Sequence, residues 1–242
     1  MKEKGEIMDI MEVISDAITY PFRNLKAVGL FLALCIIGFI ILVATGILTI
    51  FTSKPNLATG IGIAMLGVVV YIIIEIIIMG YSLDITKFGI ERSDEVPPIE
   101  VRRQLANGMF LLFTYFIYSI IPAIVTYILR MFLAKWLSGI IGLILMIIFS
   151  LALTMAECRL AKTDDIAEAI NIMEAIRDIS KVGIGKLIAL TIIILILALV
   201  AIFISLIVFK YNSILGAIVF ALLEIYVLFF SNRSIGLLYS NI

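Results

Sequence analysis

The stretch from Val28 to Gly80 decides the fold. It reads VGLFLALCIIGFIILVATGILTIF over Val28–Phe51, then a polar connection, TSKPNLAT, and then GIGIAMLGVVVYIIIEIIIMG over Gly60–Gly80. Each apolar run has about the 20 residues that an α-helix needs to cross the hydrocarbon core of a bilayer. The connection is too short for anything except a reversal of direction. The stretch therefore predicts a hairpin of two membrane-spanning helices.

The same pair of apolar runs recurs twice further along the chain. The four additional predicted spans are Gly108–Leu129, Trp136–Ala156, Leu187–Phe209 and Ile214–Phe230. Gly29, Gly108 and Gly185 stand at the start of the first run of successive copies. A recurring period of this kind indicates one structural module used three times. We expect one membrane domain over residues 1–242, with repeats at about 7–87, 97–162 and 163–242, each an amphipathic interfacial helix followed by a transmembrane hairpin.

The composition agrees with this class of protein. Hydrophobic residues make up 63% of the 242 residues and charged residues 15%, whereas soluble domains carry roughly a quarter of charged residues. A transmembrane β-barrel would show short alternating segments instead of continuous apolar runs. The predicted fold is an all-α membrane protein with six transmembrane helices.

Lysine and arginine predict the orientation, because they concentrate in the cytoplasmic connections of membrane proteins. With the N-terminus inside, fourteen of the 18 basic residues fall on the inner side. These are Lys2, Lys4, Arg23, Lys26, Lys87, Arg92, Arg102, Arg103, Arg159, Lys162, Arg177, Lys181, Lys186 and Arg233. The outer connections hold Lys54, Arg130, Lys135 and Lys210. We therefore expect a multi-pass protein of the cell membrane with both termini cytoplasmic and no cleaved signal peptide.

The segments before the hairpins have apolar residues at helical spacing. They are Ile7, Ile10, Met11, Ile14, Ala17, Ile18, Phe22 and Leu25 in the first copy, Ile99, Val101 and Leu105 in the second, and Ile166, Ala169, Ile170, Met173 and Ile176 in the third. Pro21 should bend or interrupt the first helix before the first span, and Pro98 suits a first helical position. Thr163 is the expected N-cap of the third helix and Gly183 its stop. Such helices lie in the membrane interface or pack under the bundle as a cytoplasmic collar.

Few residues could carry chemistry. The chain has no histidine, which excludes histidine-based triads and histidine-ligated zinc or haem. No nucleotide-binding motif or cysteine cluster is present, so no cofactor or metal site is predicted. Cys35 and Cys158 suggest buried thiols instead of a disulfide.

Glu75 and Glu224 are the ionisable side chains well inside predicted spans. An intramembrane carboxylate is costly and normally faces a partner or water. The two could bind a cation or relay a proton, or each could be protonated or hydrogen-bonded in a helix contact. Neighbours in sequence that could serve as partners are Tyr71, Tyr81, Tyr226 and Ser231. The middle copy has no acid at that depth, since Glu157 lies at the boundary.

Two further local features bear on packing. Pro122, inside the third span, predicts a kink that either simply bends the helix or exposes a polar cavity. Ser138 and Gly142 form a small-x-x-x-small pair, which favours close contact between helices.

The chain contains several short motifs of a recognisable kind: Asp16-Ala17-Ile18-Thr19-Tyr20-Pro21-Phe22, Gly80-Tyr81-Ser82-Leu83, Pro97-Pro98, Leu105-Ala106-Asn107-Gly108 and Gly236-Leu237-Leu238-Tyr239. These motifs resemble those of an uncharacterised family of integral membrane proteins known mainly from archaea, methanogens especially. The resemblance covers nearly the whole chain. It implies a domain of unknown function and brings no activity with it.

Three classes of function follow from these features. The first is a non-catalytic structural, assembly or interaction component, whose partners are membrane lipids and a second copy or another membrane protein, with no nucleic acid. The second is a small-solute or ion transporter or channel that uses Glu75 and Glu224. The third is a lipid-modifying enzyme with Glu157, Arg159 and Asp84 as acid, phosphate clamp and metal ligand. The sequence favours the first, a protein that is not an enzyme.

Overall fold

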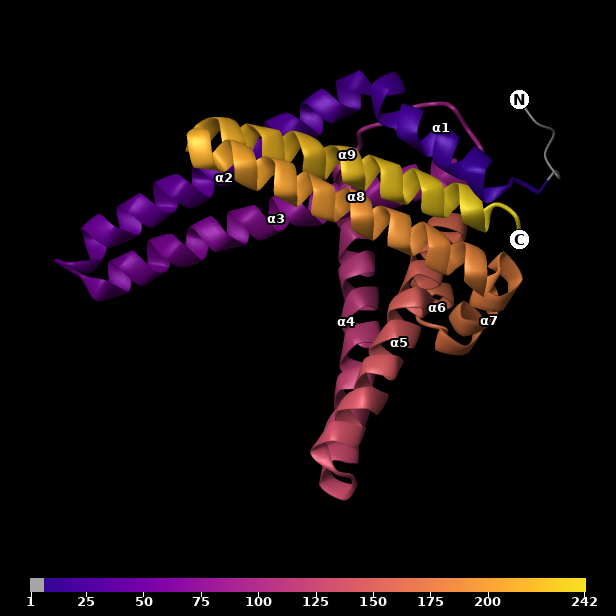
Figure 1. Ribbon diagram of the computed structural model, residues 1–242. Coiled ribbons are helices and arrows are strands. Elements are labelled where there is room, and N and C mark those ends of the chain that lie inside the picture. Colours follow the sequence, from indigo (N-terminus) through magenta and orange to yellow (C-terminus); the bar gives the residue numbers. More distant parts are fainter. Residues whose placement is uncertain (1–6) are drawn as a thin grey trace.

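The computed structural model describes residues 7–242, and its regular elements in that range are nine α-helices. Six are long: α2 (Leu25–Ser53), α3 (Leu57–Ile90), α4 (Val101–Phe132), α5 (Lys135–Thr163), α8 (Ile184–Tyr211) and α9 (Ser213–Tyr239) (Figure 1). Three are short: α1 (Ile10–Arg23), α6 (Ile166–Ala169) and α7 (Ile172–Val182). Each long helix is apolar enough to cross a membrane, which confirms the six expected apolar helices. Lys2 and Lys4 lie outside the described residues.

The long helices pair as antiparallel hairpins, α2 with α3, α4 with α5 and α8 with α9 (Figure 1). In two of the turns an asparagine side chain caps the second helix. The Asn56 side chain accepts a hydrogen bond from the Thr59 amide, and the Asn212 side chain accepts one from the Leu215 amide. Such a cap satisfies an amide at the start of a helix that has no partner within it. Polar turn residues therefore begin α3 and α9.

Small residues bring the two helices of a hairpin close together. A Cβ atom on Gly67 would lie 2.3 Å from the Thr45 hydroxyl oxygen of α2, and one on Gly142 would lie 2.6 Å from Thr126 of α4. Ser138 is fully buried. The predicted contact pair Ser138 and Gly142 is thus used inside the α4–α5 hairpin, and it is not available to a further helix.

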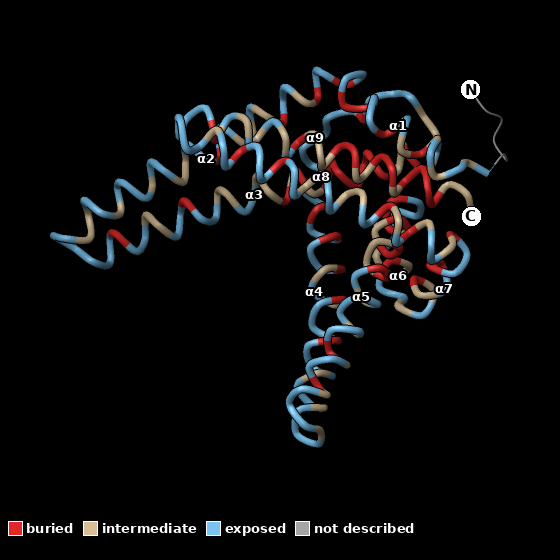
Figure 2. The backbone as a smooth tube through the Cα atoms, viewed as in Figure 1, coloured by how far each residue is buried: buried red, intermediate tan, exposed pale blue. Residues whose placement is uncertain are grey.

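The second helix of each hairpin continues beyond its predicted span. The helix expected to leave the membrane at Gly80 reaches Ile90, while α5 and α9 extend to Thr163 and Tyr239. These extensions pack together, with α3 in contact with both α5 and α9. We call them the hub, defined as residues 80–90, 151–163 and 229–239. Buried residues gather in the hub, whereas the hairpin turns are exposed (Figure 2).

Glycine permits the tightest contacts of the hub. A Cβ atom on Gly80 of α3 would lie 1.8 Å from the main-chain oxygen of Gln104 at the start of α4. One on Gly236 of α9 would lie 2.3 Å from the main-chain oxygen of Thr86 on α3. Backbones can come this close only where no side chain intervenes. The glycines therefore set the distances between α3 and its two neighbours.

The leading segments of the first two predicted repeats differ. In the first, α1 ends at Arg23, two residues after Pro21, and α2 starts anew at Leu25. In the second no separate helix forms, because the segment makes the first turns of α4. The prediction that Pro98 is the first helical residue is wrong: Glu100 is the N-cap. The Pro98 carbonyl instead accepts hydrogen bonds from side chains of α4, which hold the prolines ahead of the helix.

In the third copy the predicted N-cap is also wrong. Thr163 still belongs to α5, and its hydroxyl donates to the Arg159 carbonyl. The helix stops one residue later, at Asp164, where φ is 54°. Asp165 caps α6 and Asn171 caps α7 instead. The predicted stop at residue 183, a glycine with φ of 96°, is confirmed between α7 and α8.

The leading segments pack against the hub. Helix α1 lies along α9, the start of α4 lies on α3, and α7 lies on α5. Val13, Ala17 and Ala175 are 0% exposed, so the inner faces of α1 and α7 form a collar around the hub. Beyond the hub, the α4–α5 hairpin points away from the α2–α3 and α8–α9 hairpins (Figure 1).

Candidate functional site: the intramembrane carboxylates and the polar hub

The structure brings Glu75 of α3 and Glu224 of α9 together. The two carboxyl groups interact electrostatically with each other and with the Cys35 thiol of α2. Tyr71, one helical turn before Glu75, lies close enough to interact with it. Glu75 is half-buried, whereas Glu224 is exposed at the surface of the chain. Three helices thus place carboxyl, phenol and thiol groups at one level of the hairpins, where they could hold a proton or a cation.

Of the four expected partners, Tyr71 is the one that interacts with these glutamates in the described part of the chain. The Tyr81 hydroxyl donates to the Pro97 carbonyl, and the Tyr226 hydroxyl donates to the Ile18 carbonyl. The Ser231 hydroxyl donates within its own helix. Tyr81, Tyr226 and Ser231 are therefore near the glutamates in sequence but bond to other groups, because side chains on one helix point in different directions.

The residues predicted for lipid chemistry have separate partners. Glu157 interacts with Tyr115 of α4. A carboxylate oxygen of Asp84 lies 3.1 Å from an Arg103 guanidinium nitrogen and 3.3 Å from the Gln104 amide nitrogen. Arg159 belongs to a third cluster. Among residues 7–242, no group of three or more Cys, Asp or Glu side chains could hold a metal ion.

That third cluster is centred on Asp178 of α7, which is buried. One of its carboxylate oxygens lies 3.0 Å from Arg159 of α5 and accepts a hydrogen bond of 2.9 Å from the Tyr239 hydroxyl of α9. The other accepts one of 2.7 Å from Lys181. Arg159 also donates to the Glu168 carbonyl and pairs with its carboxylate. A single carboxylate therefore links three helices.

The electrostatics of Asp178 follow from these contacts. Burial by itself raises the pKa of a carboxyl group, since it disfavours the charged form. Here the hydrogen bonds from Lys181, Arg159 and Tyr239 outweigh burial, and the pKa of Asp178 lies below its ordinary value. The carboxylate is thus ionised and fully engaged at neutral pH. The arrangement stabilises the hub and leaves no oxygen for a ligand.

A comparable cluster surrounds Arg233 of α9, which is 1% exposed. Its Nε lies 2.8 Å from the Asp16 carboxylate of α1, and it donates to the main-chain oxygens of Ser93 at 2.6 Å and Phe88 at 3.3 Å. The guanidinium also lies over the Tyr20 ring, 4.7 Å from its centroid. From sequence, Arg233 was counted only as an inner basic residue. Its position one helical turn past the apolar run was the available signal.

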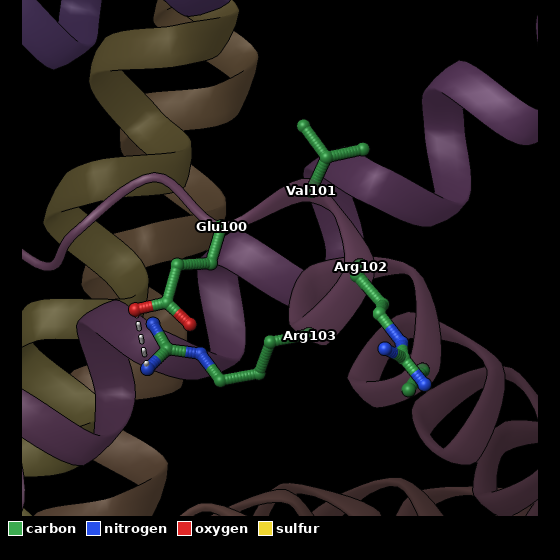
Figure 3. A pocket seen from close by; sticks show the side chains of 5 residues that line it. Glu100, Val101, Arg102 and Arg103 are labelled. Atoms are coloured by element: carbon green, nitrogen blue, oxygen red, sulfur yellow. Dashed lines mark ion pairs between the residues drawn. The ribbon is translucent and has the colours of Figure 1, made fainter.

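Two cavities open in the described part of the chain, one outside the hub and one at it. The first, of about 510 Å³, lies at the start of α4 against Glu100, Val101, Arg102, Arg103 and Ala106. Arg103 extends towards Glu100 there, whereas Arg102 points the other way (Figure 3). The second, of about 240 Å³, is lined by Arg159, Lys162, Thr163, Asp178, Lys181, Tyr239 and Ile242. Pro122 lines neither cavity and is buried in the continuous helix α4.

Six membrane-length apolar helices, paired in hairpins and tied together at a polar hub, define a multi-pass helical membrane protein. A family model described as "Protein of unknown function (DUF4013)" matches residues 63–209, which is more than half of the chain. The chain therefore belongs to this family. No curated protein and no solved structure matches it.

Proposed function

We propose that the protein is a non-catalytic structural component of the cell membrane that assembles laterally with a second copy or with another membrane protein. One observation carries the proposal. In the most apolar window of each long helix, only 11% to 28% of residues are buried within the chain. The hub ties the hairpins together at one end, so most of each helix remains available for lipid or a neighbouring helix.

Open glycines support association through the helices. A Cβ atom built on Gly29, Gly46, Gly139 or Gly185 meets no atom of the described chain within 4 Å. Helices associate in lipid through close packing at small residues, because lipid tails give no hydrophobic drive. Gly139 is the most useful of these, since its neighbours Ser138 and Gly142 already face α4. It offers a second small-residue face on α5.

The polar clusters support a structural role on the inner side. The hub clusters of Asp178 and Arg233 are made of ion pairs between helices of the chain itself. With the basic residues inside, the hub is the cytoplasmic face and both termini are cytoplasmic. We also propose that the protein is of archaeal, methanogen-type origin and that its hairpin unit is repeated three times. A lipid-modifying activity has less support, because its three residues belong to separate clusters.

Measurement of particle mass in lipid nanodiscs tests the assembly. We expect wild type to form a dimer or larger particle and Gly139→Leu to lose it, since the added side chain separates the α5 faces. The matched control is Ile140→Leu, at the exposed residue that follows Gly139. This change leaves the glycine in place. A strict monomer in the wild type, or equal loss with both variants, contradicts the proposal.

The juxtaposition of Glu75 and Glu224 supports a second function, a small-solute or ion transporter or channel. Two carboxyl groups on different hairpins give a place where a proton or cation could be held within the membrane. Proton-coupled flux in proteoliposomes tests it, with Glu75→Gln/Glu224→Gln compared with wild type. Glu157→Gln is the control, since that carboxyl group lies elsewhere in the chain, beside Tyr115. Two results together would favour the transporter over the structural component. The wild-type monomer would support flux, and only the double variant would lose it.

A further inference from the structure

Helices α1 and α7 share a sequence pattern. Residues 10–16 read IMEVISD and residues 172–178 read IMEAIRD. Each helix follows an Asx cap, Asp9 before α1 and Asn171 before α7. The two helices thus start in the same way and carry identical residues at five of these seven positions, the exceptions being Val13 against Ala175 and Ser15 against Arg177.

Their inner faces are seated in the same way. Val13 of α1 and the corresponding Ala175 of α7 are both 0% exposed. Asp16 pairs with Arg233 of α9, and the corresponding Asp178 pairs with Arg159 of α5. Each helix therefore docks through one aspartate on an arginine of a hub helix, and the Arg233 and Arg159 side chains are 2% and 13% exposed.

The outer faces of the two helices differ. On α1 and the first residue of α2, an exposed apolar stripe follows helical spacing: Met11 is 67% exposed, Ile18 43%, Phe22 65% and Leu25 66%. On α7, Met173 is 69% exposed, but Ser180 stands at the position of Ile18. Exposed Arg177 replaces Ser15. We call the residues Met11, Ile18, Phe22 and Leu25 the outer stripe.

We infer that the outer stripe of α1 inserts into the acyl layer of the leaflet next to the hub, whereas α7 stays outside the lipid. The stripe leads directly into the exposed apolar surface of α2, where Leu30, Ile36 and Ile37 begin the membrane-spanning face. An apolar helix face that joins a spanning helix is covered by the same lipid. The inference goes beyond lateral assembly and does not depend on it.

Charge on α1 and α2 fits a lipid surface. Lys26, one residue after Leu25, is exposed and makes no ion pair with any residue in the range 7–242. A lysine beside a buried apolar stripe can extend its ammonium group to anionic headgroups while its stem stays in the apolar layer. On α7, by contrast, Lys181 is paired with Asp178. The occupant of the outer stripe is therefore an anionic lipid surface.

Tryptophan fluorescence in nanodiscs tests the inference, because the chain has a single tryptophan, Trp136. In a Trp136→Phe parent, Met11→Trp and Phe22→Trp place a reporter on the outer stripe. Met173→Trp places one at the matched position of α7, which is equally exposed. Lipids brominated on their acyl chains quench tryptophans that lie in the apolar layer. Each variant must first match the parent in monodispersity and helical content.

We expect quenching at Met11→Trp and Phe22→Trp to exceed that at Met173→Trp at least about two-fold, as acyl-layer burial implies. Equal quenching at the three positions would overturn the inference. If a second copy of the chain covers the outer stripe, quenching will fall as the number of protein copies per nanodisc rises. That result would also overturn the inference. Quenching that is independent of copy number supports the lipid contact.

Discussion

Replacing Asp16 by asparagine should destabilise the whole hub, because it leaves Arg233 buried without its main counter-charge. The Arg233 side chain is 2% exposed, and its Nε lies 2.8 Å from Asp16. The other carboxylate nearby, Asp94, lies 3.6 Å away and is 63% exposed. It can compensate only weakly for the lost charge, since water screens an exposed carboxylate. The Ser93 and Phe88 carbonyls remain as neutral acceptors.

The expected magnitude follows from these contacts. Removing one partner of a buried ion pair costs about 3–5 kcal/mol. Because both carbonyl bonds remain and Asp16 is itself 22% exposed, we expect the lower end, about 3 kcal/mol. For a chain of this size, that loss lowers Tm by roughly 6–12 °C.

The native thiol of Cys158 offers the assay, because it lies in the hub and is 0% exposed. In a Cys35→Ala parent, a thiol-reactive fluorophore should report the opening of the hub as detergent-solubilised protein is heated. Asp164→Asn is the matched control. It removes another ion-paired aspartate, but one whose side chain is 56% exposed. Such surface pairs contribute about 1 kcal/mol or less.

Two results would refute the reasoning. The first is a Tm shift for Asp16→Asn that is no larger than that of Asp164→Asn. It would mean that other groups compensate the charge of Arg233 when Asp16 is lost. The double variant Asp16→Leu/Arg233→Met provides the second criterion. It removes both charges, so we expect it to be more stable than the single variant. A double variant less stable than Asp16→Asn would show that the cost came from lost packing.

The remaining predictions concern pH, close packing and topology. Hydrogen bonds lower the pKa of Asp178 in the folded state. The stability that its carboxylate contributes is therefore full above about pH 4 and is lost as the pH falls through the lowered pKa. When Tm is measured against pH in acid, the Asp178→Asn variant should lack this part of the decrease. Gly80→Ala should cost about 1–3 kcal/mol through overpacking, since its Cβ would lie 1.8 Å from a main-chain oxygen, whereas Gly185→Ala, in open space, should leave Tm unchanged. A cysteine at Asn56 should react with an impermeant reagent only from outside, and labelling only from the cytoplasmic side would reverse the topology.

Local features of the chain were enough to predict the hairpins. A continuous apolar run such as Val28–Phe51 can satisfy its backbone in lipid only as a helix, and α2 covers all of it. The stop at Gly183 was also predictable, because glycine adopts the positive φ found there without strain. These features depend only on neighbouring residues and on the general properties of a bilayer. They can therefore be predicted from the sequence.

The helix ends in the hub could not be predicted in the same way. Thr163 is a good N-cap by residue type, yet it extends α5, since the following Asp164 takes up the left-handed conformation that ends the helix. Pro98 stays outside α4 because side chains from the next turn occupy its carbonyl. In both cases the sequence allowed two conformations, and residue type alone did not decide between them.

The sequence by itself determined which groups are unusual: two intramembrane glutamates and a set of charges at the ends of the apolar runs. Only the tertiary structure decided which of them meet. Glu75 and Glu224 are far apart in the chain and come together because α3 packs against α9. Arg233 meets Asp16 across nearly the whole chain because α1 packs against α9. Such pairings depend on how hairpins pack around a common hub, and that packing is a property of all the helices at once.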